Sequence, residues 1–333
     1  MRGIFRSWGF ESEIFCEQRR ILPELRREAR DVQSYAATAK ADDVVLLHLS
    51  IGSDVNDVFA TLPCRRAILY HNITPPDYFR GVQEQIAHLL ARGRDQAKQL
   101  AGKAKVVMAD SAFNSQELRE WGYGDAQVLP LVLDLSRLRE KPNKATLRDY
   151  GDGLVNILFV GRCVPNKRLE DALSAFYYFQ RYVEPQSRFI HVGSYAGTEQ
   201  YHALLLTQAR NLQLQNVDLV GALKQDDLNA CYRAAHVFLC MSEHEGFCIP
   251  LLESMTHDLP ILAYAAAAVP DTLDGAGILF REKQFDLVAE MMGRLARDTA
   301  LRESVIRGQR ERLARYENRD LAQELRNHLA PLL

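Results

Sequence analysis

The chain has 333 residues, in which 41 Lys and Arg stand against 43 Asp and Glu for a formal net charge of −2, and 47% of the residues are hydrophobic. This length and composition predict an α/β protein of two domains with a sizeable core, while the balanced charge gives no electrostatic argument for a nucleic-acid partner. No apolar run approaches the ~20 residues that a membrane span needs.

In the first half, short apolar runs alternate with longer amphipathic segments, which is typical of parallel βαβ units. The apolar runs predict strands at residues 13–16, 44–48, 67–71, 105–109 and 128–133. The intervening patterns predict helices at residues 22–30 and 80–100, and a third helix that begins after Ser111 as its cap. Pro, Asn, Gly and charged residues then accumulate between positions 134 and 153, which predicts a domain boundary there.

After this boundary the alternation of strands and helices begins again. Apolar runs predict further strands at residues 157–160, 189–192, 217–220, 237–240, 260–263 and 277–280. A helix is expected at residues 169–182, and the chain is expected to be helical from residue 286 onward. The sequence therefore predicts a second doubly wound domain, in which ligands bind at the carboxyl ends of the strands.

The six cysteines are scattered and form no C-x-x-C pair. This spacing argues against a zinc ribbon or a disulfide framework and predicts free thiols in a cytoplasmic protein. The N-terminal residues also lack the apolar core of a signal peptide. The arginine-rich residues 17–30 leave weak docking on an anionic lipid surface, such as the inner face of the membrane, as an alternative to a solvated helix face.

Residues 242–253 have the sequence Ser-Glu-His-Glu-Gly-Phe-Cys-Ile-Pro-Leu-Leu-Glu and follow an apolar strand. Pro250 stands where the first turn of a helix would begin, and the N-terminus of that helix would form a ready anion site. Glu253 lies about one turn further on, so its carboxylate can point back at the same pocket as Glu245. Two carboxylates that accept hydrogen bonds from hydroxyls, beside an anion site, suit a nucleotide-sugar. The alternative interpretation is that Glu245 only caps the helix and that Glu253 is an ordinary solvated acid on it.

A second motif, Gly-Arg-Cys-Val-Pro-Asn-Lys-Arg at residues 161–168, follows the first strand of the second half. Its cations Arg162 and Lys167 suit an electrostatic clamp on a diphosphate leaving group. The loop matches neither the phosphate-binding P-loop nor the dinucleotide fingerprint. Ordinary surface charge near a turn is the alternative interpretation of the two cations.

Together these motifs resemble the retaining glycosyltransferases of family 4. The resemblance rests on E-G-F-x-x-P-x-x-E, which contains the E-x7-E pair Glu245 and Glu253, on the Gly-Arg…Asn-Lys loop, and on Ala-Val-Pro-Asp at 268–271. It implies the GT-B fold, an α/β architecture of two Rossmann-like, doubly wound parallel-sheet domains that face each other across a cleft. The implied parts are an acceptor-side domain at 1–140, a linker at 141–153, a donor-binding domain at 154–315, and a C-terminal helix at 316–333 that crosses back to the first domain.

The resemblance also implies roles for individual residues. Glu253 would bind the ribose hydroxyls of the donor and Glu245 would contact its sugar. Arg162 and Lys167 would stabilise charge on the departing nucleoside diphosphate, in the role that a divalent metal plays elsewhere. The backbone N–H groups of residues 246–249 (Gly246, Phe247, Cys248 and Ile249) would contact the sugar and the diphosphate. Gly221 and Leu223 would lie near the base, and His71 would lie against the sugar.

The implied reaction transfers a sugar, with retention, from a UDP-, GDP- or ADP-sugar to a hydroxyl acceptor that is a glycan, a glycolipid or a small molecule. No cofactor and no metal are expected. Residues 1–10 resemble the helix and turn that follow the family's first strand and glycine-rich loop, so the sequence predicts a first domain without that strand. Two alternatives stay open: a nucleotide-sugar-binding protein that needs a partner subunit or an oligomer for activity, and a sugar-nucleotide epimerase. His48 is a weaker candidate than His71.

Overall fold

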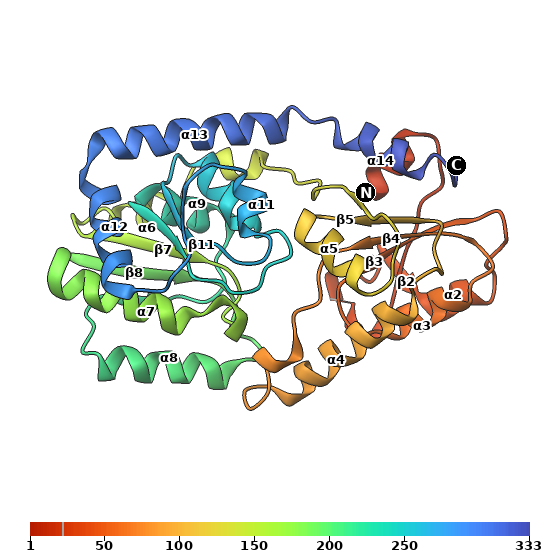
Figure 1. The fold of residues 1–333 in the computed structure, drawn as a ribbon, viewed down its shortest axis with the longest axis horizontal. Helices are drawn as coiled ribbons and strands as arrows, with labels where there is room; N and C mark the ends of the chain where they lie inside the picture. Colours follow the sequence, from red (N-terminus) through yellow and green to blue (C-terminus); the bar gives the residue numbers. More distant parts are fainter. Residues whose placement is uncertain (22) are drawn as a thin grey trace. The chain divides into compact units, whose positions relative to one another are not determined.

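A computed structural model describes residues 1–21 and 23–333 of the chain. Its contacts divide the chain into two compact units. The first unit comprises residues 1–80, 84–132 and 320–333, and the second comprises residues 81–83 and 133–319. Each unit is built on a parallel β-sheet with helices around it (Figure 1).

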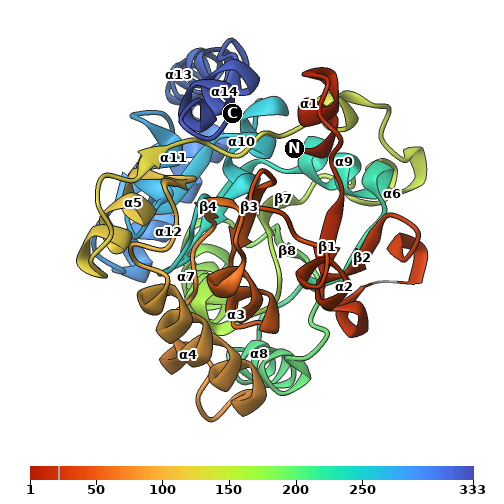
Figure 2. The ribbon, with the colours of Figure 1, turned by 90° about the vertical axis from the view of Figure 1, so that its right-hand side faces the viewer.

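The first unit has a four-stranded parallel sheet in the order β3-β4-β5-β6 and a separate parallel pair, β1-β2 (Figure 2). The strands are β1 (Ile14–Cys16), β2 (Ala29–Asp31), β3 (Val44–Leu49), β4 (Arg65–Tyr70), β5 (Val106–Ala109) and β6 (Gln127–Val128). The α-helices are α1 (Arg2–Ser7), α2 (Val32–Ala36), α3 (Asp54–Thr61), α4 (Glu84–Gln99), α5 (Ala112–Glu120) and α14 (Leu321–Leu329). Short 3-10 turns are η1 (Gln18–Arg20), η2 (Pro23–Leu25) and η3 (Pro76–Tyr78).

Most elements predicted for this unit are confirmed, including the cap of α5, where the Ser111 Oγ accepts the N–H of Asn114 at 3.2 Å. The helix predicted at 22–30 is wrong over residues 23–30, and residue 22 lies outside the described residues. The chain instead enters β2, because Ala29–Asp31 pairs in parallel with Ile14–Cys16. The strand predicted at 128–133 ends at Val128, since Pro130 has no N–H to donate to a sheet ladder.

Glu17 ties the end of β1 to the start of α3. Its Oε1 accepts hydrogen bonds from the Ser53 hydroxyl at 2.7 Å and from the Asp54 N–H at 2.9 Å, and its Oε2 lies 2.9 Å from Arg19 and 3.0 Å from Arg20. Burial opposes the charged form, but these donors outweigh it and lower the pKa of Glu17 from 4.5 to about 2.

Glu17→Gln is therefore expected to lower the free energy of unfolding at neutral pH by about 2 kcal/mol. Because the pKa is depressed in the folded state, the stabilisation is present above the unfolded value near 4.5 and is lost as the pH falls toward 2. Urea titrations should show the wild-type advantage shrinking across that window. Glu13→Gln, at an acid 43% exposed, is the matched control, and an advantage that does not change with pH would contradict the assignment.

The second unit is built on a six-stranded parallel sheet in the order β12-β11-β10-β7-β8-β9. Its strands are β7 (Val155–Val160), β8 (Ser187–Val192), β9 (Val217–Leu219), β10 (Val237–Cys240), β11 (Ile261–Tyr264) and β12 (Ile278–Phe280). The helices and turns are η4 (Ser136–Arg139), α6 (Lys144–Asp149), η5 (Pro165–Lys167), α7 (Leu169–Tyr178), the π-helix η6 (Phe179–Val183), α8 (Glu199–Asn211), α9 (Gln225–Ala234), α10 (Ile249–Thr256), α11 (Val269–Leu273), α12 (Phe285–Arg297) and α13 (Thr299–Glu317). Figure 1 shows α7 and α8 on one side of this sheet and α9 and α13 on the other.

The strand order places a switch point in the middle of this sheet. The chain builds outward from β7 through β8 to β9, then returns to β10 on the other side of β7 and continues to β11 and β12. The central strands pair at Ile157–Val237 and Leu158–Phe238, all four of which are fully buried. Ligands of doubly wound sheets bind outside the carboxyl ends of the strands at such a point. The loops there are residues 161–168 after β7 and 241–248 after β10, which are the two motifs found in the sequence.

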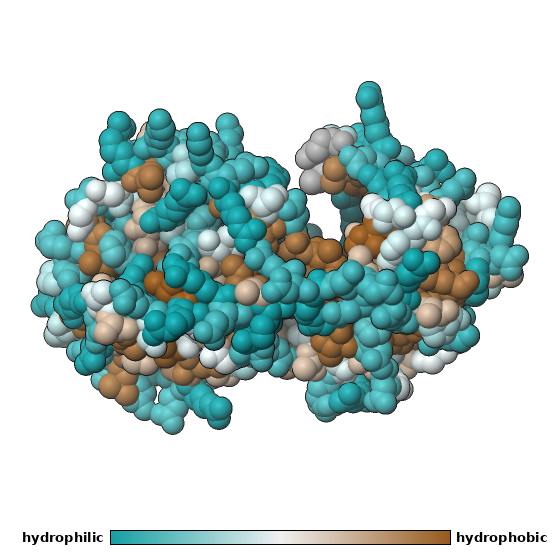
Figure 3. Space-filling model, turned by 90° about the horizontal axis from the view of Figure 1, so that it is seen from above, coloured by the Kyte–Doolittle hydropathy of each residue, from teal (hydrophilic) through white to brown (hydrophobic). Residues whose placement is uncertain are grey.

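Within residues 1–21 and 23–333, no helix has both the length and the apolar character that crossing a membrane requires. The face drawn in Figure 3 is covered mostly by hydrophilic side chains, with smaller hydrophobic patches between them.

Candidate active site

The two loops at the switch point are joined to each other through Asn166. Its side-chain Nδ2 donates to the backbone carbonyl of His244 at 2.9 Å, and the backbone carbonyl of Asn166 accepts a hydrogen bond from the N–H of Glu243 at 2.9 Å. Asn166 is only 5% exposed, so both hydrogen bonds are shielded from water. This link fixes the backbone on either side of the site and explains the Asn of the Asn-Lys motif as a structural residue.

Lys167 and Glu245 meet at the centre of the site. Lys167 ends the turn η5, and its Nζ contacts a carboxylate oxygen of Glu245, whose side chain is 7% exposed. Burial alone would lower the pKa of Lys167, but the negative charge of Glu245 outweighs it, and the pKa lies above its ordinary value. The pair therefore sets an ammonium on a side chain that is 17% exposed against a buried carboxylate. The sequence predicted both residues for the site but not that they pair with each other.

The loop after β10 reaches α10 through a left-handed residue. Cys248 has φ 66° and ψ 64° and stands directly before α10 (Ile249–Thr256), while Pro250 occupies the first turn as the sequence predicted. The Phe247 carbonyl accepts a hydrogen bond from the Thr272 hydroxyl, which anchors the loop to α11. The first turn of any helix leaves backbone N–H groups without partners inside the helix, so the start of α10 offers donors to an anion.

Glu253 lies one turn inside α10 and accepts a hydrogen bond from the Tyr232 hydroxyl of α9 at 2.6 Å. Burial raises the pKa of Glu253, and the Tyr232 hydrogen bond opposes that rise only in part. The Tyr232 ring is 1% exposed and stacks on His257 at 5.0 Å. Tyr232 therefore orients the carboxylate from a fixed position. The sequence analysis missed it because a tyrosine on a helix face has no distinguishing local signal.

The other residues predicted for the second unit follow β7 and β9 of the same sheet. Arg162 is exposed on the loop after β7. Gly221, with φ 72°, follows β9 and accepts the N–H of Gly193 at 2.8 Å, and Leu223 is half-buried two residues later. A Cβ on Gly193 would lie 1.8 Å from the carbonyl oxygen of Gly161, so this close packing of the three loops needs glycine.

Lys283 holds the site loop from the side. Its Nζ lies 2.6 Å from an oxygen of Asp171 and 2.7 Å from an oxygen of Glu243, and it sits over the Tyr264 ring at 4.6 Å. Arg168, the residue after Lys167, also contacts Glu243 at 3.3 Å. These cations restrain the residue two positions before Glu245. The sequence analysis did not find them, since Lys283 is far away in the chain.

In the first unit, His71 belongs to a hydrogen-bonded chain of three residues. Its Nε2 lies 2.8 Å from the Nδ1 of His48, and its Nδ1 lies 3.3 Å from an oxygen of Asp110, which is 2% exposed. The protein atoms around the His48 ring and the neighbouring His71 lower its pKa to about 4. His48 lies in β3 opposite Leu69, and His71 directly follows β4. Both histidines were predicted candidates, whereas Asp110 was missed.

Solved structures place the fold in a known class. The chain is similar to HepE of Anabaena in complex with UDP and glucose, with a TM-score of 0.72 and 18% identity over 90% of this chain and 81% of that one. It is also similar to sucrose-phosphate synthase from Thermosynechococcus elongatus, with a TM-score of 0.69 and 20% identity over 86% of this chain and 73% of that one. These proteins are GT-B glycosyltransferases, and the chain has the GT-B fold that the sequence predicted.

At the level of sequence, residues 151–312 match the family described as glycosyl transferases group 1. O-antigen chain mannosyltransferase B of Escherichia coli is 24% identical over 147 residues, which are 44% of this chain and 38% of that protein. GDP-mannose:cellobiosyl-diphosphopolyprenol alpha-mannosyltransferase of Xanthomonas oryzae pv. oryzae is 28% identical over 179 residues, 52% of this chain and 47% of that protein. The matched stretches thus span less than half of these relatives. The second unit resembles group 1 glycosyltransferases, which confirms the predicted resemblance at this coarser level.

Proposed function

We propose that the protein is a retaining, metal-independent glycosyltransferase of family 4 that moves a sugar from a nucleotide-sugar to a hydroxyl acceptor. The observation that carries the proposal is the buried Lys167–Glu245 pair beside the N-terminus of α10, at the switch point of a doubly wound sheet. The family match over residues 151–312 supports the reaction class. A bound diphosphate and a polyhydroxyl ring are the chemistry that this donor set recognises.

In the proposed reaction the bound donor separates Lys167 from Glu245 and takes each of them as a partner. The diphosphate takes the ammonium of Lys167 and the guanidinium of Arg162, together with backbone N–H groups of residues 246–249. Glu245, released from Lys167, accepts hydrogen bonds from hydroxyls of the donor sugar. Glu253 accepts hydrogen bonds from the ribose, and Gly221 and Leu223 lie near the base. Once the donor is bound and the ion pair has opened, these groups would stabilise the leaving diphosphate without further reorganisation at the moment of transfer.

Retention without a protein nucleophile favours front-face substitution. An oxygen of the leaving phosphate accepts the proton of the acceptor hydroxyl as the new glycosidic bond forms on the same face. His71 is proposed to hydrogen-bond a hydroxyl of the donor sugar, with its ring oriented by Asp110 and His48. Because Arg162 and Lys167 supply the positive charge that stabilises the anionic leaving diphosphate, the step needs no divalent ion.

The first test measures donor turnover and its metal dependence. We expect release of nucleoside diphosphate from one of the sugar nucleotides UDP-glucose, GDP-mannose or an ADP-sugar when hydroxyl acceptors are supplied, at a rate that excess EDTA leaves unchanged within about twofold. The anomeric configuration of the product, read by NMR, should equal that of the donor. Strict dependence on Mg²⁺ would contradict the charge role of the two cations, and an inverted product would contradict the front-face step.

The same assay separates the two alternatives. A sugar-nucleotide epimerase would interconvert donors with no acceptor present, and a binding protein would bind the donor but release no diphosphate without a partner. We propose that the activity is cytoplasmic, because six scattered cysteines without a C-x-x-C pair suit free thiols in a reducing compartment. Contact with the inner face of the membrane stays a prediction from the arginine-rich residues 17–30.

A further inference from the structure

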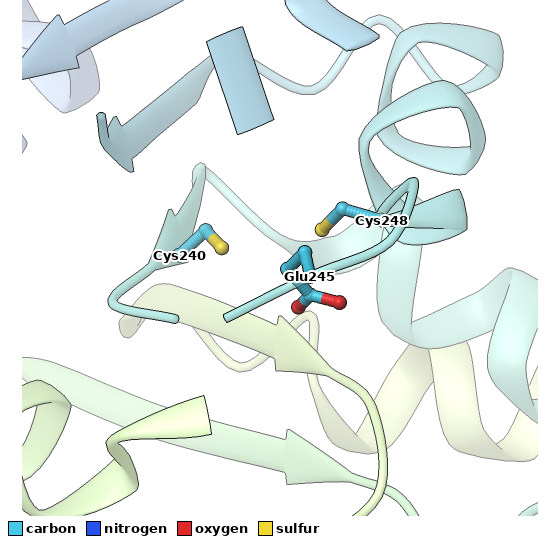
Figure 4. Close-up of side chains that lie close together, drawn as sticks. All are labelled: Cys240, Glu245 and Cys248. Carbon is cyan, nitrogen blue, oxygen red and sulfur yellow. The ribbon is translucent and has the colours of Figure 1, made fainter. Parts of the chain in front are cut away.

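Two cysteines and a glutamate lie together in the loop after β10. Cys240 is the last residue of that strand, Cys248 stands directly before α10, and Glu245 comes from the loop between them, with the two sulfur atoms pointing toward each other (Figure 4). One sulfur or carboxylate oxygen from each residue lies within 4.8 Å of the other two. Cys240 is 0% exposed, Cys248 is 6% exposed and Glu245 is 7% exposed. A thiol pair and a carboxylate are thus enclosed at one point.

We propose that Cys240, Glu245 and Cys248 form a binding site for a thiophilic divalent cation, of which Zn²⁺ is the type. Thiolate and carboxylate are both zinc ligands, and three protein ligands with water in the fourth position make an ordinary tetrahedral site. With Zn–S bonds of about 2.3 Å, tetrahedral geometry spaces the ligand atoms about 3.8 Å apart. The ligand atoms lie within 4.8 Å of one another in the structure, so binding would need them to approach by up to about 1 Å.

Charge balance favours the cation. Two thiolates and one carboxylate carry three negative charges, which Zn²⁺ and the ammonium of Lys167 together neutralise. A buried cluster of charges needs such balance because it has lost the stabilisation that water would give. The carboxylate has two oxygens, so Lys167 keeps one while the cation takes the other.

A disulfide between the two cysteines accounts for less of the geometry. It would use only the sulfur atoms, would leave the carboxylate to Lys167 alone, and would need the sulfurs about 2.05 Å apart. The presence of Glu245 within the same distance of both sulfurs is what a metal site requires. The cluster also differs from a catalytic metal site of the proposed reaction, because the cation would sit on the carboxylate that is to contact the donor sugar.

Occupation of the site should therefore compete with the donor, and this part of the inference rests on the proposed function. A cation bound to Glu245 withdraws its carboxylate from the sugar hydroxyls and fixes the loop of residues 241–248. We expect saturating Zn²⁺ to weaken donor binding to the wild-type chain at least tenfold.

The test titrates the reduced 333-residue chain with Co²⁺, which binds zinc sites and absorbs light when thiolates ligate it. We expect one Co²⁺ per chain, with thiolate-to-cobalt charge-transfer absorption that added Zn²⁺ removes. Cys248→Gly should weaken Co²⁺ binding at least tenfold and lower the intensity of this absorption, because one thiolate ligand is lost. This variant will fold, because Cys248 has φ 66° and glycine adopts that conformation freely. Cys240→Ser should have the same effect, while Cys231→Ser, at a buried cysteine outside the cluster, should have none.

Three results would overturn the inference. They are no thiolate absorption with Co²⁺, an unchanged Co²⁺ affinity in Cys248→Gly, and a mass lower by two hydrogens that marks a Cys240–Cys248 disulfide in the protein as purified. The cobalt titration contains no donor, so failure of the proposed transferase function would leave its result standing. Donor binding that Zn²⁺ does not affect would overturn the competition.

Discussion

Glu253→Ala is expected to weaken nucleoside-diphosphate binding at least about 10²-fold while the chain stays folded. The carboxylate is proposed to accept two ribose hydroxyls, and each hydrogen bond to a charged group contributes about 1.5–3 kcal/mol. Isothermal calorimetry measures the effect directly. Part of the cost falls on stability, because the buried Tyr232 hydroxyl loses its partner at 2.6 Å, so a lower melting temperature should accompany the loss of affinity.

Tyr232→Phe is the matched control for that variant. It removes the orienting hydrogen bond but keeps the carboxylate, so affinity should fall by less than about tenfold. Burial raises the pKa of Glu253, and hydroxyl binding needs the ionised form. Wild-type affinity should therefore decline as the pH falls through this raised pKa, and the alanine variant should lack that decline. Unchanged affinity in Glu253→Ala would sink the assignment of the nucleotide site.

The second unit could be predicted from sequence because its local signals and its fold agree. Buried parallel strands appear as apolar runs, and the residues after them, such as Arg162 and Glu245, stand at the sheet edge where ligands bind. Helix α7 gives way to a π-helix at Phe179, so the helix predicted to residue 182 was correct in extent but not in type. Local patterns were therefore sufficient for elements and for the position of the two motifs.

Contacts between segments far apart in the chain could not be predicted in this way. The Lys167–Glu245 pair, the Tyr232–Glu253 hydrogen bond and the Asp110–His71 contact each join residues from different loops or helices. In the first unit, β1–β2 pairing overrides the helical pattern at 22–30, because strand pairing there depends on residues about fifteen positions earlier. Single-sequence periodicity contains no information on such pairs.

The largest loss of rate is expected when Arg162 or Lys167 is replaced. Because the two side chains differ in burial, the two variants separate an effect on kcat from an effect on stability. Arg162 is exposed, so Arg162→Met should leave the melting temperature unchanged and lower kcat by about 10²–10³, the size seen when one oxyanion donor is removed. Lys167→Met should lower kcat similarly, but it also leaves the Glu245 carboxylate buried without its ammonium. That uncompensated charge should cost about 3–5 kcal/mol of stability.

The double variant Lys167→Met with Glu245→Gln decides whether these two effects are separate. Removing both charges should restore most of the lost stability, because a neutral amide needs no counter-charge, yet turnover should stay about 10²–10³ below that of Glu245→Gln alone. Lys283→Met is the control: it breaks the ion pairs to Asp171 and Glu243 and should lower stability with a smaller effect on kcat. Turnover of the double variant equal to that of Glu245→Gln alone would show that Lys167 supports the loop and does not act on the leaving group.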